Sequence, residues 1–197
     1  IVSVIELMSG YQYKVRVTGD CAPYAESAPV ILTVVHQAEI TQQPASQESC
    51  EGTSATFTVN AGLTTNPTYQ WQLSTDGVTW TNISGATSST YTIPLVTTAM
   101  NNNMYRVIVA STCGSALTSL PVYLVVDEKP EIISQPSDAV HCVGEIANFV
   151  VDAGNTTGAS YQWQLSTDNG GTWNNLSESA KYFGVQTSNL KINGVIN

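Results

Sequence analysis

Asp76 and Asp168 are the two carboxylates whose sequence surroundings suggest a chemical role. Each follows a serine by two positions and precedes a glycine and a tryptophan. Residues 166–173 fit the pattern S-x-D-x-G-x-T-W, whereas residues 74–80 are one residue shorter. In such a segment the aspartate accepts hydrogen bonds from backbone amides and the glycine takes a positive φ, which makes a hairpin turn. We therefore interpret both segments as turns and assign neither aspartate a catalytic role.

The other acids and the histidines form no catalytic or metal-binding pattern. Asp127, Glu128 and Glu131 lie close enough in sequence to suggest Ca²⁺ binding. The equivalent positions of the preceding repeat, defined below, hold Val35 and His36 in place of the first two acids. A repeated calcium linker would keep its ligands, so a solvated surface is favoured. No nucleophile, phosphate-loop or zinc-protease motif is present, and we expect no enzymatic activity, no metal and no cofactor.

Two tryptophans near turns, Trp80 and Trp173, could stack on a sugar ring. The plainer interpretation is that each covers the edge of a sheet. Both interpretations remain open from the sequence.

Composition excludes several classes of protein. The chain has 197 residues, six Lys+Arg against fifteen Asp+Glu, and a net charge of −9. So few cations cannot neutralise a row of phosphates, so we expect no nucleic-acid partner. No apolar run reaches the length of a membrane span, and residues 1–6 lack the basic start of a signal peptide. We expect a segment of a longer extracellular protein.

An internal repeat organises the chain. The sequence Tyr-Gln-Trp-Gln-Leu-Ser-Thr-Asp occurs at residues 69–76 and again at 161–168, an offset of 92 residues. The same offset relates Cys21 to Cys113 and Cys50 to Cys142. A period of this length matches one small domain per repeat. We predict the end of one repeat at 1–36, a complete repeat at 37–128 and most of a third at 129–197, arranged head to tail.

Within a repeat the pattern predicts short strands separated by turns. Residues 56–59, 69–73, 91–93, 105–109 and 121–126 alternate or run apolar, and Gly, Asn and Asp clusters lie between them. No window has helical periodicity. The fold class predicted is all-β, a two-sheet sandwich in each repeat. Its core residues are predicted at Val59, Trp71, Tyr105 and Val107, with Trp163 in the third repeat.

These features resemble the immunoglobulin fold, and in particular its intermediate-set domains. Trp71 lies where strand C carries its core tryptophan, and Tyr105 matches the tyrosine corner before strand F. The sequence departs from the family at Val59 and Val107, where the inter-sheet cysteines would fall. We expect apolar packing onto Trp71 to replace that disulfide.

The four cysteines are disulfide candidates at other positions: Cys21, Cys50, Cys113 and Cys142. Pairs without a CxxC motif favour an oxidising compartment. The immunoglobulin-like arrangement places Cys50 and Cys113 at opposite ends of a sandwich, which favours bonds between neighbouring repeats. A Cys50–Cys113 bond with different strand ends, or free thiols, remain open.

The amino-acid sequence of the repeat is similar to the immunoglobulin-like repeats of giant Bacteroidetes cell-surface proteins. These include SprB-like gliding-motility adhesins and other type IX secretion substrates. That resemblance implies a secreted, non-enzymatic stalk or adhesive array at the extracellular cell surface, associated with the outer membrane, for attachment or gliding. Its partners would be neighbouring repeats and surface polysaccharide or other cell-surface proteins. The alternative is an accessory or carbohydrate-binding region of a secreted glycan-degrading enzyme.

Overall fold

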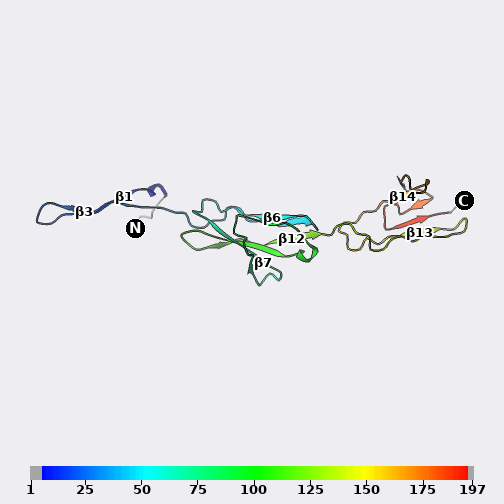
Figure 1. Ribbon diagram of the computed structural model, residues 1–197, viewed down its shortest axis with the longest axis horizontal. Coiled ribbons are helices and arrows are strands. Elements are labelled where there is room, and N and C mark those ends of the chain that lie inside the picture. The colour runs from blue at the N-terminus through cyan, green and yellow to red at the C-terminus, as the bar shows by residue number, and fades with distance from the viewer. Residues whose placement is uncertain (1–5, 195–197) are drawn as a thin grey trace. The chain divides into compact units, whose positions relative to one another are not determined.

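A computed structural model of the chain describes residues 6–194, which are strands and turns apart from two short 3-10 helices, η1 (Glu6–Met8) and η2 (Thr98–Met100) (Figure 1). The chain divides into two compact units. The first unit contains most of the chain as far as Val125. The second contains the chain from Val126 onward together with the short segments Ser49–Thr53 and Val96–Ala99. The predicted all-β class is confirmed.

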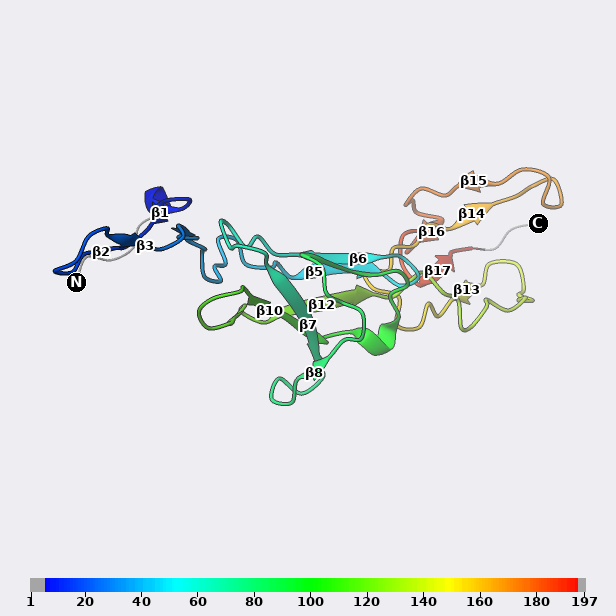
Figure 2. The ribbon, with the colours of Figure 1, turned by 60° about the vertical axis from the view of Figure 1, so that its left-hand side comes forward.

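The segment 37–128 forms two sheets (Figure 2). The larger has the order β5–β12–β10–β7–β8, and β11 pairs with β10. The smaller is the pair β6–β9. The bounds are β5 (Gln47–Cys50), β6 (Ala55–Thr58), β7 (Thr68–Ser74), β8 (Thr81–Asn82), β9 (Thr90–Ile93), β10 (Met104–Ala110), β11 (Leu117–Thr118) and β12 (Val122–Asp127).

The alternation of β10 shows why this sequence makes a sandwich. Tyr105, Val107 and Val109 are buried, and the residues between them are partly exposed, because successive side chains of a strand point to opposite faces. β10 pairs antiparallel with β7 over all seven residues of each strand, with Val107 opposite Trp71. Both of those side chains are 0% exposed. The apolar face of this strand pair therefore packs into one core.

An aromatic cluster fills that core. The ring centroids of Phe57 and Tyr105 lie 4.7 Å apart, and those of Phe57 and Trp71 lie 6.2 Å apart. The Trp71 indole N–H donates to the carbonyl of Ser88 at 2.9 Å, so the polar end of the ring is satisfied. Val59 is also buried. The positions where the immunoglobulin family carries cysteines are thus occupied by packed valines.

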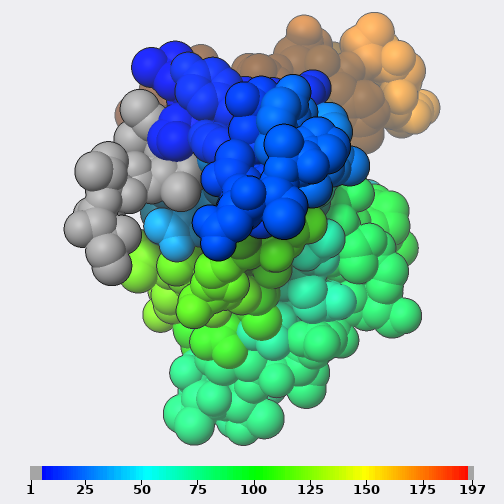
Figure 3. All heavy atoms as spheres, turned by 90° about the vertical axis from the view of Figure 1, so that its left-hand side faces the viewer, coloured from blue at the N-terminus to red at the C-terminus, as the bar shows by residue number. Residues whose placement is uncertain are grey.

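We call β10, β11 and β12 the closing hairpin of the repeat. The segment 6–36 has the same hairpin, built from β1 (Gln12–Tyr13), β2 (Arg16–Val17), β3 (Ala25–Glu26) and β4 (Val30–Ile31). Its pairs Tyr13↔Val30 and Arg16↔Glu26 are the equivalents of Tyr105↔Val122 and Ile108↔Thr118 at the offset of 92 residues. Figure 3 shows the atoms of this segment in blue.

The segment from 129 to 194 contains the other strands of the repeat. It contains β13 (Ala147–Val150), β17 (Asn189–Ile192), β16 (Tyr182–Phe183), β14 (Gln164–Leu165) and β15 (Asn174–Asn175). β13 pairs with β17 as β6 pairs with β9. Among the described residues it has no closing hairpin. Strand β14 is two residues long where its equivalent β7 has seven, because the partner that pairs along β7 is β10.

Candidate functional site

The turn at Asp76 uses its carboxylate as a structural acceptor. Oδ1 accepts hydrogen bonds from the amides of Val78 and Thr79 at 2.8 and 2.7 Å, and from the Ser74 hydroxyl at 2.9 Å. These donors hold the pKa of Asp76 well below its usual value, the Thr79 amide most strongly. The turn joins β7 to β8. The prediction of a hairpin turn at this position is confirmed.

The second turn, at Asp168, has the same construction with one more residue. Asp168 Oδ1 accepts from the Thr172 amide and from the Ser166 hydroxyl, each at 2.8 Å, and Oδ2 accepts from the Thr172 hydroxyl at 2.9 Å. These bonds lower the pKa of Asp168 to about 2. The turn joins β14 to β15. A carboxylate held ionised by its own turn is a poor proton donor or acceptor near neutral pH.

Trp80 belongs to a stacked polar group that the sequence interpretation missed. The Arg106 guanidinium lies 4.1 Å from the Trp80 ring centroid, within the range of a cation–π contact. The Arg106 Nε also donates to Gln72 Oε1 at 2.7 Å, and Gln72 Nε2 donates to Asn82 Oδ1 at 2.8 Å. The signal in the sequence was an arginine in the middle of an otherwise apolar strand.

Trp173, the equivalent of Trp80, is 59% exposed. Gln164 Nε2 donates to Asn175 Oδ1 at 2.8 Å, as Gln72 does to Asn82. Within residues 6–194, however, no donor reaches Gln164 Oε1 and no cation stacks on Trp173. The structure therefore places the two tryptophans differently: Trp80 lies under a cation and Trp173 is open.

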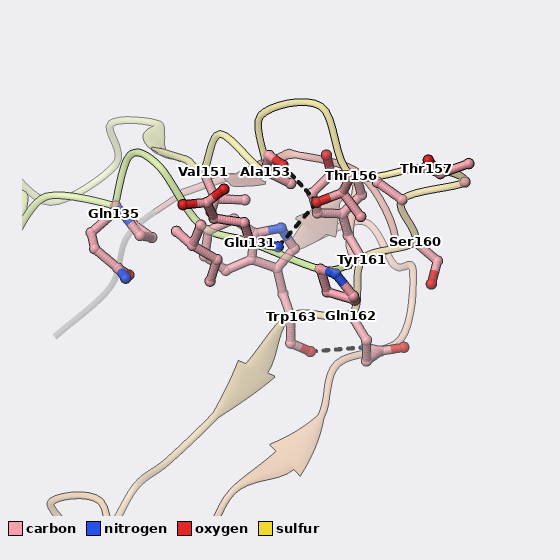
Figure 4. A pocket seen from close by; sticks show the side chains of 15 residues that line it. Glu131, Gln135, Val151, Ala153, Thr156, Thr157, Ser160, Tyr161, Gln162 and Trp163 are labelled. Atoms are coloured by element: carbon pink, nitrogen blue, oxygen red, sulfur yellow. Dashed lines mark hydrogen bonds between the residues drawn. The ribbon is translucent and has the colours of Figure 1, made fainter. Parts of the chain in front are cut away.

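A pocket of about 450 Å³ lies beside Trp163 in the third segment (Figure 4). Gln135 stands at one end of it and Thr157 and Ser160 at the other. The Thr156 hydroxyl fixes one wall, since it accepts from the Glu131 amide at 3.1 Å and donates to the Ala153 carbonyl at 2.7 Å. Apart from these bonds the lining is mainly apolar and includes Ile132, Val151 and Tyr161.

Trp163 and its neighbours form an incomplete core. Trp163 packs against Phe149 with ring centroids 6.5 Å apart, close to the 6.2 Å of the equivalent Phe57–Trp71 pair. Its indole N–H donates to the Thr187 carbonyl at 2.9 Å. Trp163 is nevertheless half-buried, whereas Trp71 is fully buried. Trp163 therefore lies at its predicted core position, but one side of its ring faces the pocket.

The four cysteines of the chain are free thiols in the structure. Cys21, Cys50 and Cys142 are exposed, and Cys113 is partly buried. The Cys113 thiol lies 3.7 Å from the Val35 carbonyl oxygen. No bond joins Cys50 to Cys113, and pairing with cysteines of further repeats stays a prediction.

Across residues 6–194, no group of three or more His, Cys, Asp or Glu side chains converges in a way that could hold a metal ion. In the same part of the chain, no helix has the length and hydrophobicity needed to cross a membrane.

Known proteins similar to this chain point to its fold. A family model described as a domain of unknown function (DUF8696) matches residues 40–128. The titin I-band fragment I67–I69 superimposes with a TM-score of 0.61 at 16% identity, covering 83% of this chain and 57% of the fragment. Sidekick-1 immunoglobulin domains 1–5 give 0.56 at 16% identity, covering 100% of this chain and 42% of theirs. The fold is tandem immunoglobulin-like. Extracellular domains 3–5 of Drosophila OTK give 0.54 at 20% identity, covering 98% and 64%.

A curated protein is similar in sequence as well. Endoglucanase C of Cellulomonas fimi is 31% identical over 135 residues, which is 68% of this chain. The match spans 12% of the length of that relative.

Proposed function

We propose that these immunoglobulin-like repeats are a non-catalytic segment of a large extracellular protein, forming a stalk or an adhesive array that serves cell-surface attachment or gliding. The observation that carries this proposal is the repeat of one sandwich design at an offset of 92 residues, with the same turn and the same tryptophan site in each copy. Repeated modules make a longer stalk, and many individually weak contacts together give a stronger attachment.

The turn chemistry supports a structural role. The two carboxylates that the sequence singled out, Asp76 and Asp168, are occupied by hydrogen bonds within their own hairpins. The partners proposed are neighbouring repeats of the same chain and surface polysaccharide or other cell-surface proteins. The location proposed is the outer surface of a bacterial cell, and the resemblance of the repeat to SprB-like adhesins suggests it.

A second candidate is an accessory or carbohydrate-binding region of a glycan-degrading enzyme. Two observations favour it: the similarity to Endoglucanase C and the exposure of Trp173. An exposed tryptophan offers the flat apolar face on which a sugar ring stacks.

Retention of the free chain on insoluble cellulose and in gels containing soluble β-glucan separates the two candidates. The stalk or array predicts no retention of the free chain, but attachment to surface polysaccharide when beads carry many copies. The accessory region predicts retention of the free chain that Trp173→Ala abolishes and Val143→Ala, an exposed control in the same segment, leaves intact. Retention with that mutational pattern would overturn the first candidate.

A further inference from the structure

The linker from the first segment, residues 6–36, into the complete repeat is fastened by two threonine side chains. The His36 amide donates to the Thr65 hydroxyl at 2.8 Å, and the Glu39 amide donates to the Thr64 hydroxyl at 2.9 Å. The Thr65 amide also donates to the His36 carbonyl at 3.2 Å. Adjacent threonines thus hold both ends of the stretch 36–39. We call such a threonine pair, with the loop that carries it, the linker clasp.

The same clasp is present one repeat later. The Glu128 amide donates to the Thr157 hydroxyl at 2.8 Å, and the Glu131 amide donates to the Thr156 hydroxyl at 3.1 Å (Figure 4). Each of these residues lies 92 positions after its counterpart. The first residue held is a histidine in one linker and a glutamate in the other. The clasp therefore recognises the backbone of the linker, whatever side chain the linker carries at this position.

Bonds within the loop fix the position of the threonines. The Thr64 amide donates to the Ala61 carbonyl at 3.1 Å, and the Gly62 amide donates to Asn60 Oδ1 at 2.9 Å. Gly62 has a φ of 52°, and a side chain on it would collide with the Glu39 carboxylate, so glycine is required. The third segment repeats these loop bonds at Asp152, Ala153, Gly154 and Thr156. A loop ordered in this way holds a linker at a low entropic cost.

The change from one repeat to the next takes place without a free residue. Asp127 is the last residue of β12, and its carbonyl accepts from the Glu51 amide at 2.8 Å. Glu128 follows directly, and its amide donates to Thr157 of the next repeat. Consecutive residues are therefore bonded to consecutive repeats. A rotation of the backbone at this point would break one of the two sets of bonds.

We propose that the linker clasp makes each connection between repeats a fixed joint. The threonine hydroxyls hold the linker on the repeat that follows, and the stretches 36–39 and 128–131 do not act as hinges. Flexible linkers coil and shorten the average reach of a chain, whereas stiff connectors preserve it. The inference concerns the joint alone, so it goes beyond the proposed stalk or array and is independent of what the repeats bind.

Backbone ¹⁵N relaxation of the full chain tests the clasp at single residues. Thr157→Val removes the acceptor of the Glu128 amide and leaves the side chain about the same size. The order parameter of Glu128 should be about 0.85 in the unmodified chain and should fall below about 0.6 in the variant. Thr65→Val should have the same effect at His36. Thr157→Ser is the matched control, because it keeps the hydroxyl and should keep the order parameter near 0.85.

Proteolysis provides a second measurement. A glutamate-specific protease cleaves after Glu128 when the linker opens, and loss of the threonine acceptor should accelerate this cleavage about tenfold. Thr90→Val, the same change at an exposed residue of β9, should leave the rate unchanged.

Three results would overturn the proposal. The first is an order parameter at Glu128 that is below about 0.6 in the unmodified chain or stays near 0.85 in Thr157→Val. The second is equal cleavage of Thr157→Val and Thr157→Ser. The third is a lower urea midpoint of the sandwich in Thr65→Val, because that threonine would then hold the fold and not the linker.

Discussion

Truncation of Val107 to alanine tests whether the valine pair has replaced the missing inter-sheet disulfide. Val107 is fully buried and lies opposite Trp71. The repeat provides a matched control, because Val15 is the same residue at the equivalent position of the first segment and is 58% exposed. The same change is therefore made once inside a core and once outside one.

The expected cost follows from the burial. Val→Ala removes two methyl groups, worth about 1.6 kcal/mol at about 0.8 kcal/mol each. The cavity left beside Trp71, which lies opposite Val107, adds to this, because a rigid aromatic ring collapses poorly onto a gap. The sum is about 2–3 kcal/mol for Val107→Ala. For Val15→Ala the exposed position predicts less than about 0.5 kcal/mol.

Urea denaturation in a background with Trp163→Phe and Trp173→Phe reports the sandwich alone, since the remaining fluorescence comes from Trp71 and Trp80. In the same background the midpoint temperature of thermal unfolding should fall by on the order of 10–20 °C for Val107→Ala. A loss below about 1 kcal/mol for Val107→Ala, or equal losses for both variants, would refute the assignment of this valine to the core.

Two further outcomes are expected. NMR titration of the Asp168 carboxyl should give a pKa of about 2. Because the folded pKa is depressed, the turn's contribution to stability is complete above the ordinary aspartate pKa of 3.8 and is lost as the pH falls through about 2. A midpoint near 4 would contradict the turn geometry. Arg106→Met leaves Gln72 Oε1 without its donor and should destabilise the sandwich by about 1–3 kcal/mol in urea, whereas Lys14→Met at the equivalent exposed position should leave that transition unmoved.

The sequence predicted the elements that depend only on residues close to them in the chain. Alternation identified β6 and β10, and the Ser-x-Asp pattern identified both hairpin turns because the aspartate bonds only to its own neighbours. The burial of Trp71 followed from its position in an immunoglobulin-like pattern. These features need no knowledge of the remote chain.

Features that depend on a distant partner were harder to predict. The seven residues of β7 and the stretch 160–166 are almost the same sequence, yet only β7 is a full strand, because pairing with β10 decides the length. The Arg106–Gln72–Trp80 group was missed for the same reason: residues far apart in sequence meet only after the strands pair. The pocket beside Trp163 is lined by residues from separate stretches between Pro130 and Trp163, which no local pattern brings together.

The position of the closing hairpin within the repeat has a consequence for biogenesis. The hairpin is the last part of each repeat in chain order, so a sandwich emerging from a ribosome or a secretion channel stays open until its final residues have appeared. During that interval the tryptophan site is exposed beside neighbours that are built on the same repeat and share motifs such as Tyr-Gln-Trp-Gln-Leu-Ser-Thr-Asp. Similar adjacent domains are prone to exchange strands. The order of synthesis therefore selects for fast closure of each repeat, and a pause before residues 104–126 would be the step at which the wrong hairpin is captured.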